Sequence, residues 1–213
     1  MRPDPQLAID RYRRLAAGYD ASSRREWPRR LRTIDALELV PGAVVLDVAC
    51  GTGLSFAPLV ERVGAAGTVV GVELSPQMGE FAAARIEAAG WRNVHLRVED
   101  IAAADLSRFR FDAVLLHYAH DVLCSPPALA NVFAHARPGA TVAIAGIKTV
   151  HPLLAPLNLW ARARGWRYRT SSEHLAAPWR ALAPWVPRFD VETFLLGTAF
   201  VGRGRVRDMF PRR

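Results

Sequence analysis

The feature that most constrains the fold is a regular alternation of strand and helix patterns between residues 41 and 150. Residues 43–48 form a run rich in β-branched residues that is typical of a strand buried on both faces. Four further strands are predicted at Thr68–Leu74, Val94–Val98, Phe111–Leu116 and Thr141–Ile147. Because strands that alternate with helices at this spacing form βαβ units, we expect an α/β fold with a doubly wound, mostly parallel sheet.

The helices between these strands have recognisable starts and ends. The apolar residues of 56–63 fall on one face of a helix. Ser75 followed by Pro76 is typical of a helix N-terminus, and Gly90 ends that helix. A third helix is predicted at Ala128–Ala136.

The regions outside this alternation follow other patterns. Leu7–Ala17 and Arg24–Leu39 are predicted to be helices, and Phe189–Leu196 with Thr198–Val206 to be an antiparallel hairpin. Pro152–Trp185 contains four of the six tryptophans, and we expect it to be a helical insertion over the carboxyl edge of the sheet. We therefore expect one domain with an N-terminal helical cap (1–40), a ligand-binding core (41–150), a lid insertion (151–187), and a closing hairpin with a tail (188–213).

A glycine-rich turn, Gly51-Thr52-Gly53, follows the first predicted strand. Such a turn brings the backbone close to a ligand without choosing the ligand. A nicotinamide site requires a third glycine three residues later, where this chain has Phe56. Asp47, just before the turn, would repel a pyrophosphate and attract a ligand with ammonium and sulfonium groups, unless it merely caps the loop.

Two more acids follow the next two strands. Glu73 ends the second strand, where a carboxylate can accept hydrogen bonds from both ribose hydroxyls. Asp100 follows the third strand and can accept from an adenine amino group, while Ile101 packs on the ring. The ends of adjacent parallel strands share one crevice, so we expect these acids and Asp47 to lie together.

The segments around these acids resemble motifs of a known family. Residues 45–53 are similar to motif I of class I S-adenosylmethionine-dependent methyltransferases, and residues 71–75 to the ribose-binding segment that follows. Residues 111–115 and 137–140 resemble two later sheet motifs, and the chain looks closest to the quinone-biosynthesis-like and phospholipid-headgroup-like small-molecule enzymes. The resemblance implies a Rossmann-like, seven-stranded sheet with an antiparallel last strand. It also implies S-adenosylmethionine as cofactor and S-adenosylhomocysteine as product.

The resemblance implies a set of cofactor-binding residues. They are Tyr19, Asp47, Ala49, Gly51, Gly53, Glu73, Leu74, Met78, Asp100, Ile101 and His117. Ala49 departs from the family, which usually has glycine there, and we expect its methyl group to be tolerated in a β conformation. Tyr19 follows the first predicted helix and would close over the cofactor, the alternative being a surface tyrosine.

The end of the fourth predicted strand provides the candidate catalytic residues. Methyl transfer from a sulfonium is an in-line displacement, which gains mostly from positioning and from the exclusion of water. Where the nucleophile must lose a proton, His120 and Asp121 are the first candidates for the base and His117 the third. Alternatively, His117 is a wall beside the cofactor and Asp121 caps the next helix. We expect no metal site at the two histidines.

Aromatic residues are the candidates for binding the methyl acceptor. We expect Tyr19, Tyr118, His120 and Trp160 to contact it. Tryptophans in an insertion over the site would form a lid for a flat or apolar molecule, or a cation–π cage for a methylated amine. The alternative is that they simply pack the insertion on the sheet.

The charge of the chain is concentrated outside the core. Residues 41–150 carry eight basic and ten acidic residues, so the flanks carry the other 20 basic and 10 acidic ones, a net charge of +10. This excess either meets an anionic partner, namely an acidic small molecule, a phospholipid surface or nucleic acid, or reflects genomic composition. With no long apolar run and no signal-like N-terminus, we expect a cytoplasmic protein.

These observations favour a methyltransferase for a small aromatic or lipophilic acceptor at oxygen, nitrogen or carbon. The alternative is N-methylation of a phospholipid amine at a membrane surface, which the arginines and tryptophans would suit. We expect no nucleic-acid partner, because residues 116–119 lack the Asn/Asp-Pro-Pro-aromatic segment of base-amino methylases. A cofactor-binding protein without transferase activity is the remaining hypothesis.

Overall fold

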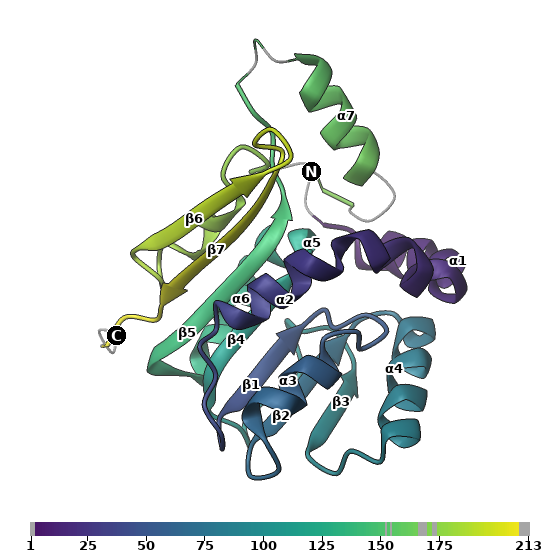
Figure 1. The fold of residues 1–213 in the computed structure, drawn as a ribbon, viewed down its shortest axis with the longest axis vertical. Helices are drawn as coiled ribbons and strands as arrows, with labels where there is room; N and C mark the ends of the chain where they lie inside the picture. Colours follow the sequence, from purple (N-terminus) through teal and green to yellow (C-terminus); the bar gives the residue numbers. More distant parts are fainter. Residues whose placement is uncertain (1–2, 152, 154, 166–169, 172–173, 209–213) are drawn as a thin grey trace.

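The computed structural model describes residues 3–151, 153, 155–165, 170–171 and 174–208. These residues fold around a seven-stranded sheet with the order β3-β2-β1-β4-β5-β7-β6 (Figure 1). The strands are β1 (Val44–Val48), β2 (Thr68–Glu73), β3 (Val94–Val98), β4 (Phe111–His117), β5 (Ala136–Ile147), β6 (Phe189–Phe194) and β7 (Ala199–Arg205). Strands β1 to β5 pair in parallel, whereas β7 runs antiparallel to both β5 and β6. The predicted seven-stranded sheet with an antiparallel last strand is confirmed.

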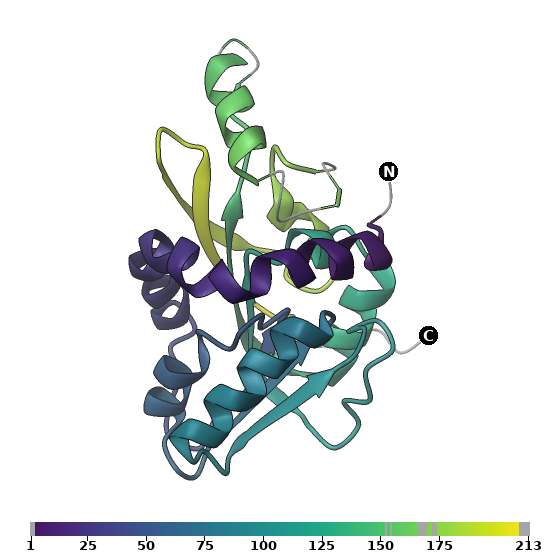
Figure 2. The ribbon, with the colours of Figure 1, turned by 90° about the vertical axis from the view of Figure 1, so that its right-hand side faces the viewer.

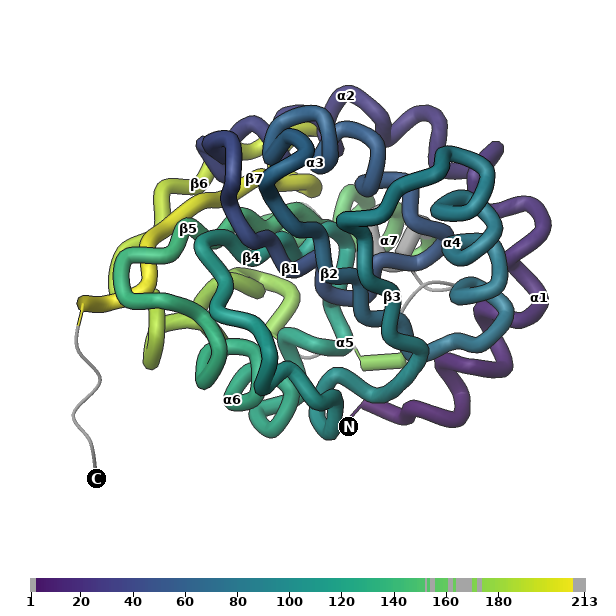
Figure 3. Tube along the Cα trace, turned by 90° about the horizontal axis from the view of Figure 1, so that it is seen from below, coloured from purple at the N-terminus to yellow at the C-terminus, as the bar shows by residue number. Residues whose placement is uncertain are grey.

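Helices cover both faces of the sheet, as the view along it shows (Figure 3). They are α1 (Pro5–Ser23), α2 (Trp27–Asp35), α3 (Phe56–Val63), α4 (Pro76–Ala89), α5 (His120–Leu123), α6 (Pro126–His135) and α7 (Ala155–Gly165), with 3-10 turns η1 (Arg24–Glu26) and η4 (Pro178–Leu182). Helices α2 and α3 lie on one face, and α5 and α6 on the other. None of the helices in the described part of the chain combines the length and hydrophobicity that a bilayer crossing requires.

Alternation along the strands divides the core into two clusters. Val45 and Leu115 face α2 and α3, whereas Leu46 and Leu116 face α6. By the same alternation, Asp47 and His117 point toward the α2 side of the sheet. The strands therefore place an acid and an imidazole under the helix that precedes the core.

Phe56 is the central side chain of the cluster on the α2 side. It is fully buried, and a Cβ atom added at Gly53 or Gly71 would lie 2.6 Å from its ring. The ring therefore occupies the space that both glycines leave open. This packing explains why the chain has phenylalanine where a nicotinamide loop has its third glycine.

The N-terminal helix is longer than predicted. It runs from Pro5 through Gly18 to Ser23, so Tyr19 lies within the helix rather than after it. Asp4 caps its start by accepting a hydrogen bond from the amide of Leu7 at 3.0 Å. A glycine inside a helix costs only about 1 kcal/mol, which the packing of α1 across the end of the sheet outweighs (Figure 2).

Other predicted boundaries are also corrected. The second N-terminal helix splits into η1 and α2 and ends at Asp35. Helix α6 begins at Pro126, because proline suits the first turn of a helix, and β5 begins at Ala136, before the turn where it was expected to start.

The predicted insertion contains α7 and η4. Two of its tryptophans pack in the core, as Trp185 stacks on Phe133 and Trp179 meets Phe200 edge-on, each with ring centroids 5.0 Å apart. Trp166 lies outside the described residues. Trp179 and Trp185 therefore pack the insertion on the sheet, which was the alternative to their forming a lid.

Candidate active site

Two adjoining cavities lie at the carboxyl ends of the central strands, beneath α1. The larger has a volume of about 590 Å³ and the smaller about 90 Å³. The residues that line both are Tyr12, Tyr19, His117, Tyr118 and His120. The two cavities therefore meet at the end of β4, where catalytic residues were expected.

The smaller cavity has the chemistry expected for the cofactor. Its walls include Ala49, Gly51, Glu73, Leu74 and Met78 from the predicted cofactor-binding set. Glu73 and Asp121 are its acids, and no arginine or lysine is found among its described lining residues. Such a lining suits a cationic nucleoside and would repel a pyrophosphate.

Glu73 is prepared to hold a ribose. Its carboxylate is 6% exposed and accepts hydrogen bonds from the amides of Gly51 and Ser75, both at 2.8 Å. Burial raises the pKa of Glu73, and interactions with the backbone amides of Ser75, Gly51 and Leu74 oppose that shift. A carboxylate has about four acceptor positions, so about two are left for the hydroxyl groups of a sugar. The residues at the end of β2 thus fit S-adenosylmethionine.

Helix α1 forms the roof of the smaller cavity. Asp20 connects α1 to the glycine turn and to α4, because it accepts hydrogen bonds from Thr52 at 2.6 Å and from Arg85 at 2.5 Å. With α1 in this position, the 90 Å³ cavity is below the roughly 300 Å³ at which small-molecule sites begin. We therefore expect α1 to move outward when the cofactor enters.

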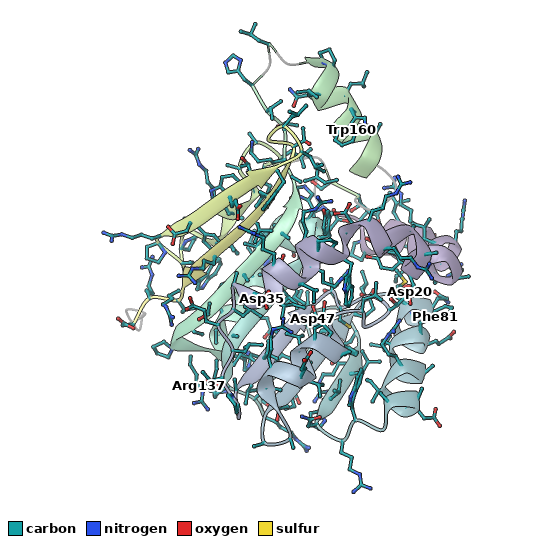
Figure 4. All side chains as sticks on the ribbon, in the orientation of Figure 1. Asp20, Asp35, Asp47, Phe81, Arg137 and Trp160 are labelled. Carbon is teal, nitrogen blue, oxygen red and sulfur yellow. The ribbon has the colours of Figure 1, made fainter. Side chains whose placement is uncertain are left out.

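Asp47 lies on β1 in the interior of the molecule (Figure 4). It is 2% exposed, it interacts with Ser55 and with the charge of Arg30, and its Oδ2 atom has no hydrogen-bond partner among the described residues. Asp47 does not line either cavity in the described part of the chain, so its contact with the cofactor ammonium stays a prediction. Burial raises the pKa of Asp47 to about 7, although the charge of Arg30 lowers it.

The raised pKa of Asp47 predicts a pH-dependent effect of Asp47→Asn. The folded protein holds this proton with a pKa of about 7, against an ordinary value of 3.8, so the group's contribution to stability is lost as pH rises through about 7. Relative to the wild type, the variant's free energy of unfolding should therefore increase between about pH 5 and about pH 8. Urea denaturation at both pH values measures this difference, and a difference that does not change with pH would contradict the assignment.

The backbone conformation of Ala49 differs from the one expected. It was expected to keep a β conformation, but its φ is 56°, in the left-handed region. Asp47-Val48-Ala49 must turn there to bring Gly51 beneath Glu73, and this conformation costs a residue with a Cβ atom about 1–2 kcal/mol. The chain thus has alanine, with some backbone strain, where the family that it resembles usually has glycine.

Replacing Ala49 with glycine should relieve this backbone strain. Ala49→Gly should raise the free energy of unfolding by about 1 kcal/mol, which corresponds to about 2–4 °C in Tm for a domain of this size. The matched control is Ala84→Gly on an exposed position of α4, which should lower stability by about 1 kcal/mol. Thermal unfolding that shows the same sign for both variants would disprove the strain at Ala49.

The end of β4 is held in an unusual conformation. Tyr118 has a φ of 60°, and its hydroxyl donates to Glu26 at 2.5 Å and accepts from Arg29 at 3.3 Å. Arg29 also bonds Glu26 directly, so it supports Tyr118 and Glu26, which line the larger cavity. Burial raises the pKa of Tyr118, and the charge of Glu26 raises it further.

His117 is the most unusual polar residue at the junction of the cavities. It is 7% exposed, and neither ring nitrogen has a hydrogen-bond partner among the described residues. Burial lowers the pKa of His117 well below its usual range, and the charges of Arg30 and Arg29 lower it further. A neutral, buried imidazole with both nitrogens unused is a strong indication of a bound ligand.

The other two catalytic candidates are engaged in local contacts. The Nε2 atom of His120 lies 3.6 Å from the Sγ atom of Cys124. Asp121 accepts hydrogen bonds from the amide and hydroxyl of Thr170 at 2.8 and 2.9 Å and from the amide of Ser171 at 3.1 Å. Asp121 therefore fastens the insertion to α5, a geometry that favours a positioning role.

Three predicted contact residues lie away from the cavities. Asp100 accepts from the amide of Ala102 at 2.9 Å, and neither Asp100 nor the buried Ile101 is among the described residues lining the smaller cavity. Trp160 is 44% exposed on α7, far from Asp47 in Figure 4. Their contacts with cofactor or acceptor stay predictions.

The contribution of α2 to the site was not predicted. Arg30 is 6% exposed, lines the larger cavity and donates to Ser55 at 2.7 Å. A signal was present, because Arg30 shares the apolar helix face of Ile34 and Leu37 at i, i+4 and i+7. An arginine on a buried helix face needs a polar partner or a ligand.

The sequence of this chain is similar to those of known proteins. Residues 45–139 match a family model described as a methyltransferase domain. The chain is 32% identical to a 2-phytyl-1,4-naphtoquinone methyltransferase of Thermosynechococcus vestitus, over 73% of this chain and 69% of that protein. It is 33% identical to the nocamycin O-methyltransferase of Saccharothrix syringae, over 62% of this chain but 48% of that relative, about half its length.

The fold also has counterparts among solved structures. A SAM-dependent methyltransferase from Aquifex aeolicus superposes with a TM-score of 0.58 at 18% identity, covering 83% of this chain and 89% of that one. At this identity the likeness concerns the fold alone.

Proposed function

Because the chain belongs to the class I S-adenosylmethionine-dependent methyltransferases, we propose that it methylates a small aromatic or lipophilic acceptor bound in the larger cavity. The observation that carries this proposal is the pair of adjoining cavities with a shared wall at His117, Tyr118 and Tyr19. The volume of about 590 Å³ lies within the roughly 300–1,000 Å³ of small-molecule sites. Leu123, Phe200 and other apolar side chains in its lining suit such an acceptor.

Each residue at the junction has a role in this proposal. When bound, S-adenosylmethionine supplies an electrophilic methyl group on a sulfonium centre. Glu73 accepts from the ribose, Tyr19 on α1 closes over the site, and Tyr118 orients the acceptor. His117 is the first candidate to hydrogen-bond the acceptor, because its ring lies at the shared wall and burial keeps it neutral. His120 is the second candidate.

The relatives' names agree with this class of acceptor. One acts on a naphthoquinone and another is an O-methyltransferase, by the names they carry. We extend only the class, a small molecule with an aromatic or lipophilic body, to this chain.

A transfer assay tests the proposal. The protein is incubated with S-adenosylmethionine labelled in the methyl group and, separately, with lipophilic phenols, quinols, aromatic acids, amines and phosphatidylethanolamine vesicles. We expect label in the solvent extract of one or more aromatic acceptors. Label only in the phospholipid would favour the membrane alternative. No transfer despite tight binding of S-adenosylhomocysteine would favour a non-catalytic binding protein.

A further inference from the structure

Arg30 places a buried positive charge in the wall of the larger cavity. A guanidinium has five N–H donors, and the structure gives this one a single hydrogen-bond acceptor among the described residues, Ser55 Oγ at 2.7 Å. The residue is 6% exposed and lines the cavity. A buried charge with unused donors is costly unless a ligand completes it.

The neighbouring acids do not cancel this charge. Asp47 interacts with the charge of Arg30, but burial raises the pKa of Asp47 to about 7, so near neutral pH it is only partly ionised. Glu26 lines the same cavity but already pairs with Arg29 and accepts from Tyr118. Arg25 adds another positive charge to the lining. The cavity around Arg30 is therefore positively charged.

His117 completes a polar pair with Arg30. Both side chains line the larger cavity on the α2 side of the sheet, and both are more than nine-tenths buried. The two ring nitrogens of His117 have no partner among the described residues, so the neutral ring can donate one hydrogen bond to a bound oxygen. A cation and a neutral donor facing one cavity form a receptor for a single anionic oxygen group.

We propose that the methyl acceptor carries an acidic oxygen group, a phenol, enol or carboxylic acid, which binds as its anion against Arg30 with a hydrogen bond from His117. This inference rests on the proposed function. In the reaction a C–O bond forms as the C–S bond breaks, the bonding pair stays on sulfur, and the anion and the sulfonium become neutral products. No base is required, because the acceptor enters already ionised. An ammonium acceptor would instead be repelled by Arg30 and Arg25.

The test compares three ligands of nearly equal shape by calorimetric titration of the protein saturated with S-adenosylhomocysteine. They are 1-naphthoate, 1-naphthamide and 1-naphthylmethylammonium. A charge-assisted hydrogen bond contributes about 1.5–3 kcal/mol, so we expect naphthoate to bind at least about tenfold more tightly than the amide, and the ammonium most weakly. Equal affinities, a preference for the ammonium, or binding of none of the three would overturn the inference.

Substitutions test whether Arg30 causes the preference for naphthoate. Arg30→Met should abolish the preference for naphthoate, and Arg30→Lys should retain part of it, because lysine keeps the charge but not the planar set of donors. The matched control is Arg32→Met, since Arg32 is on the same helix, has a side chain 56% exposed and pairs with Glu192 outside the cavity. Thermal unfolding establishes that each variant is folded. If Arg30→Met does not fold, the reduced preference for naphthoate in Arg30→Lys is the test. A full preference in either Arg30 variant contradicts the proposal.

Cofactor binding separates this inference from the proposed function. Failure of the wild type to bind S-adenosylhomocysteine would refute the function itself, whereas normal binding without an anion preference refutes only the inference. The cofactor also carries a carboxylate. If Arg30→Met weakens S-adenosylhomocysteine but not 5′-methylthioadenosine, which lacks that carboxylate, Arg30 serves the cofactor and the acceptor assignment is overturned.

Discussion

Replacing Glu73 with glutamine should weaken the binding of S-adenosylhomocysteine about a hundredfold or more. The carboxylate is expected to accept hydrogen bonds from two ribose hydroxyls, and charge-assisted hydrogen bonds contribute about 1.5–3 kcal/mol each. An amide has only one oxygen, so glutamine also cannot accept from both Gly51 and Ser75, whose amides bond the two carboxylate oxygens at 2.8 Å. Calorimetric titration of folded variant and wild type measures the loss.

Glu99→Gln is the matched control for this substitution. Glu99 directly follows the neighbouring strand β3, and its side chain is 36% exposed and lies 3.6 Å from Arg97. Its replacement should leave the affinity unchanged within about twofold, because partly exposed ion pairs contribute little. If Glu73→Gln also binds within about threefold of the wild type, the end of β2 does not hold the ribose.

Replacing Phe56 with alanine should lower the free energy of unfolding by about 3–5 kcal/mol. The ring is fully buried and fills the space left open by Gly53 and Gly71, so its removal leaves a cavity between the glycine turn and β2. Urea denaturation measures the change. Loss of cofactor affinity should accompany it, because the turn that carries Gly51 rests on this ring.

Phe81→Ala provides the comparison for the same chemical change at a partly exposed position. Phe81 is 44% exposed on α4, and its truncation should change stability by only about 0.5 kcal/mol. Equal effects at both positions would mean that Phe56 does not support the core as the structure indicates.

The strands and the helices between them could be predicted because their signals are local. The apolar run at Val44–Val48, the helix at Phe56–Val63, and the cap at Ser75 with the stop at Gly90 all follow from neighbouring residues. The length of α1 could not be predicted, since Gly18 suggests an end that tertiary packing overrides. The conformation of Ala49 is likewise set by the Glu73–Gly51 contact, which is long-range.

The candidate site could be predicted only in part, for the residues that lie at the ends of strands. That Glu73 and His117 lie together could be predicted, because strand ends in a parallel sheet share one edge. Partners from other elements were not predictable: Asp121 is engaged by Thr170, 49 residues away, and Arg30 reaches Ser55, 25 residues away. Such contacts depend on how helices pack over the sheet, which no local pattern encodes.

A crystal structure with S-adenosylhomocysteine tests the central claim most directly, that the carboxyl edge of β1, β2 and β4 holds a cationic nucleoside next to an acceptor cavity. We expect both ribose hydroxyls to bind the Glu73 carboxylate and α1 to be displaced from its present position. We also expect the sulfur atom to face the larger cavity at His117 and Tyr118. A nucleoside bound away from Glu73, or a sulfur atom sealed off from the larger cavity, would contradict it.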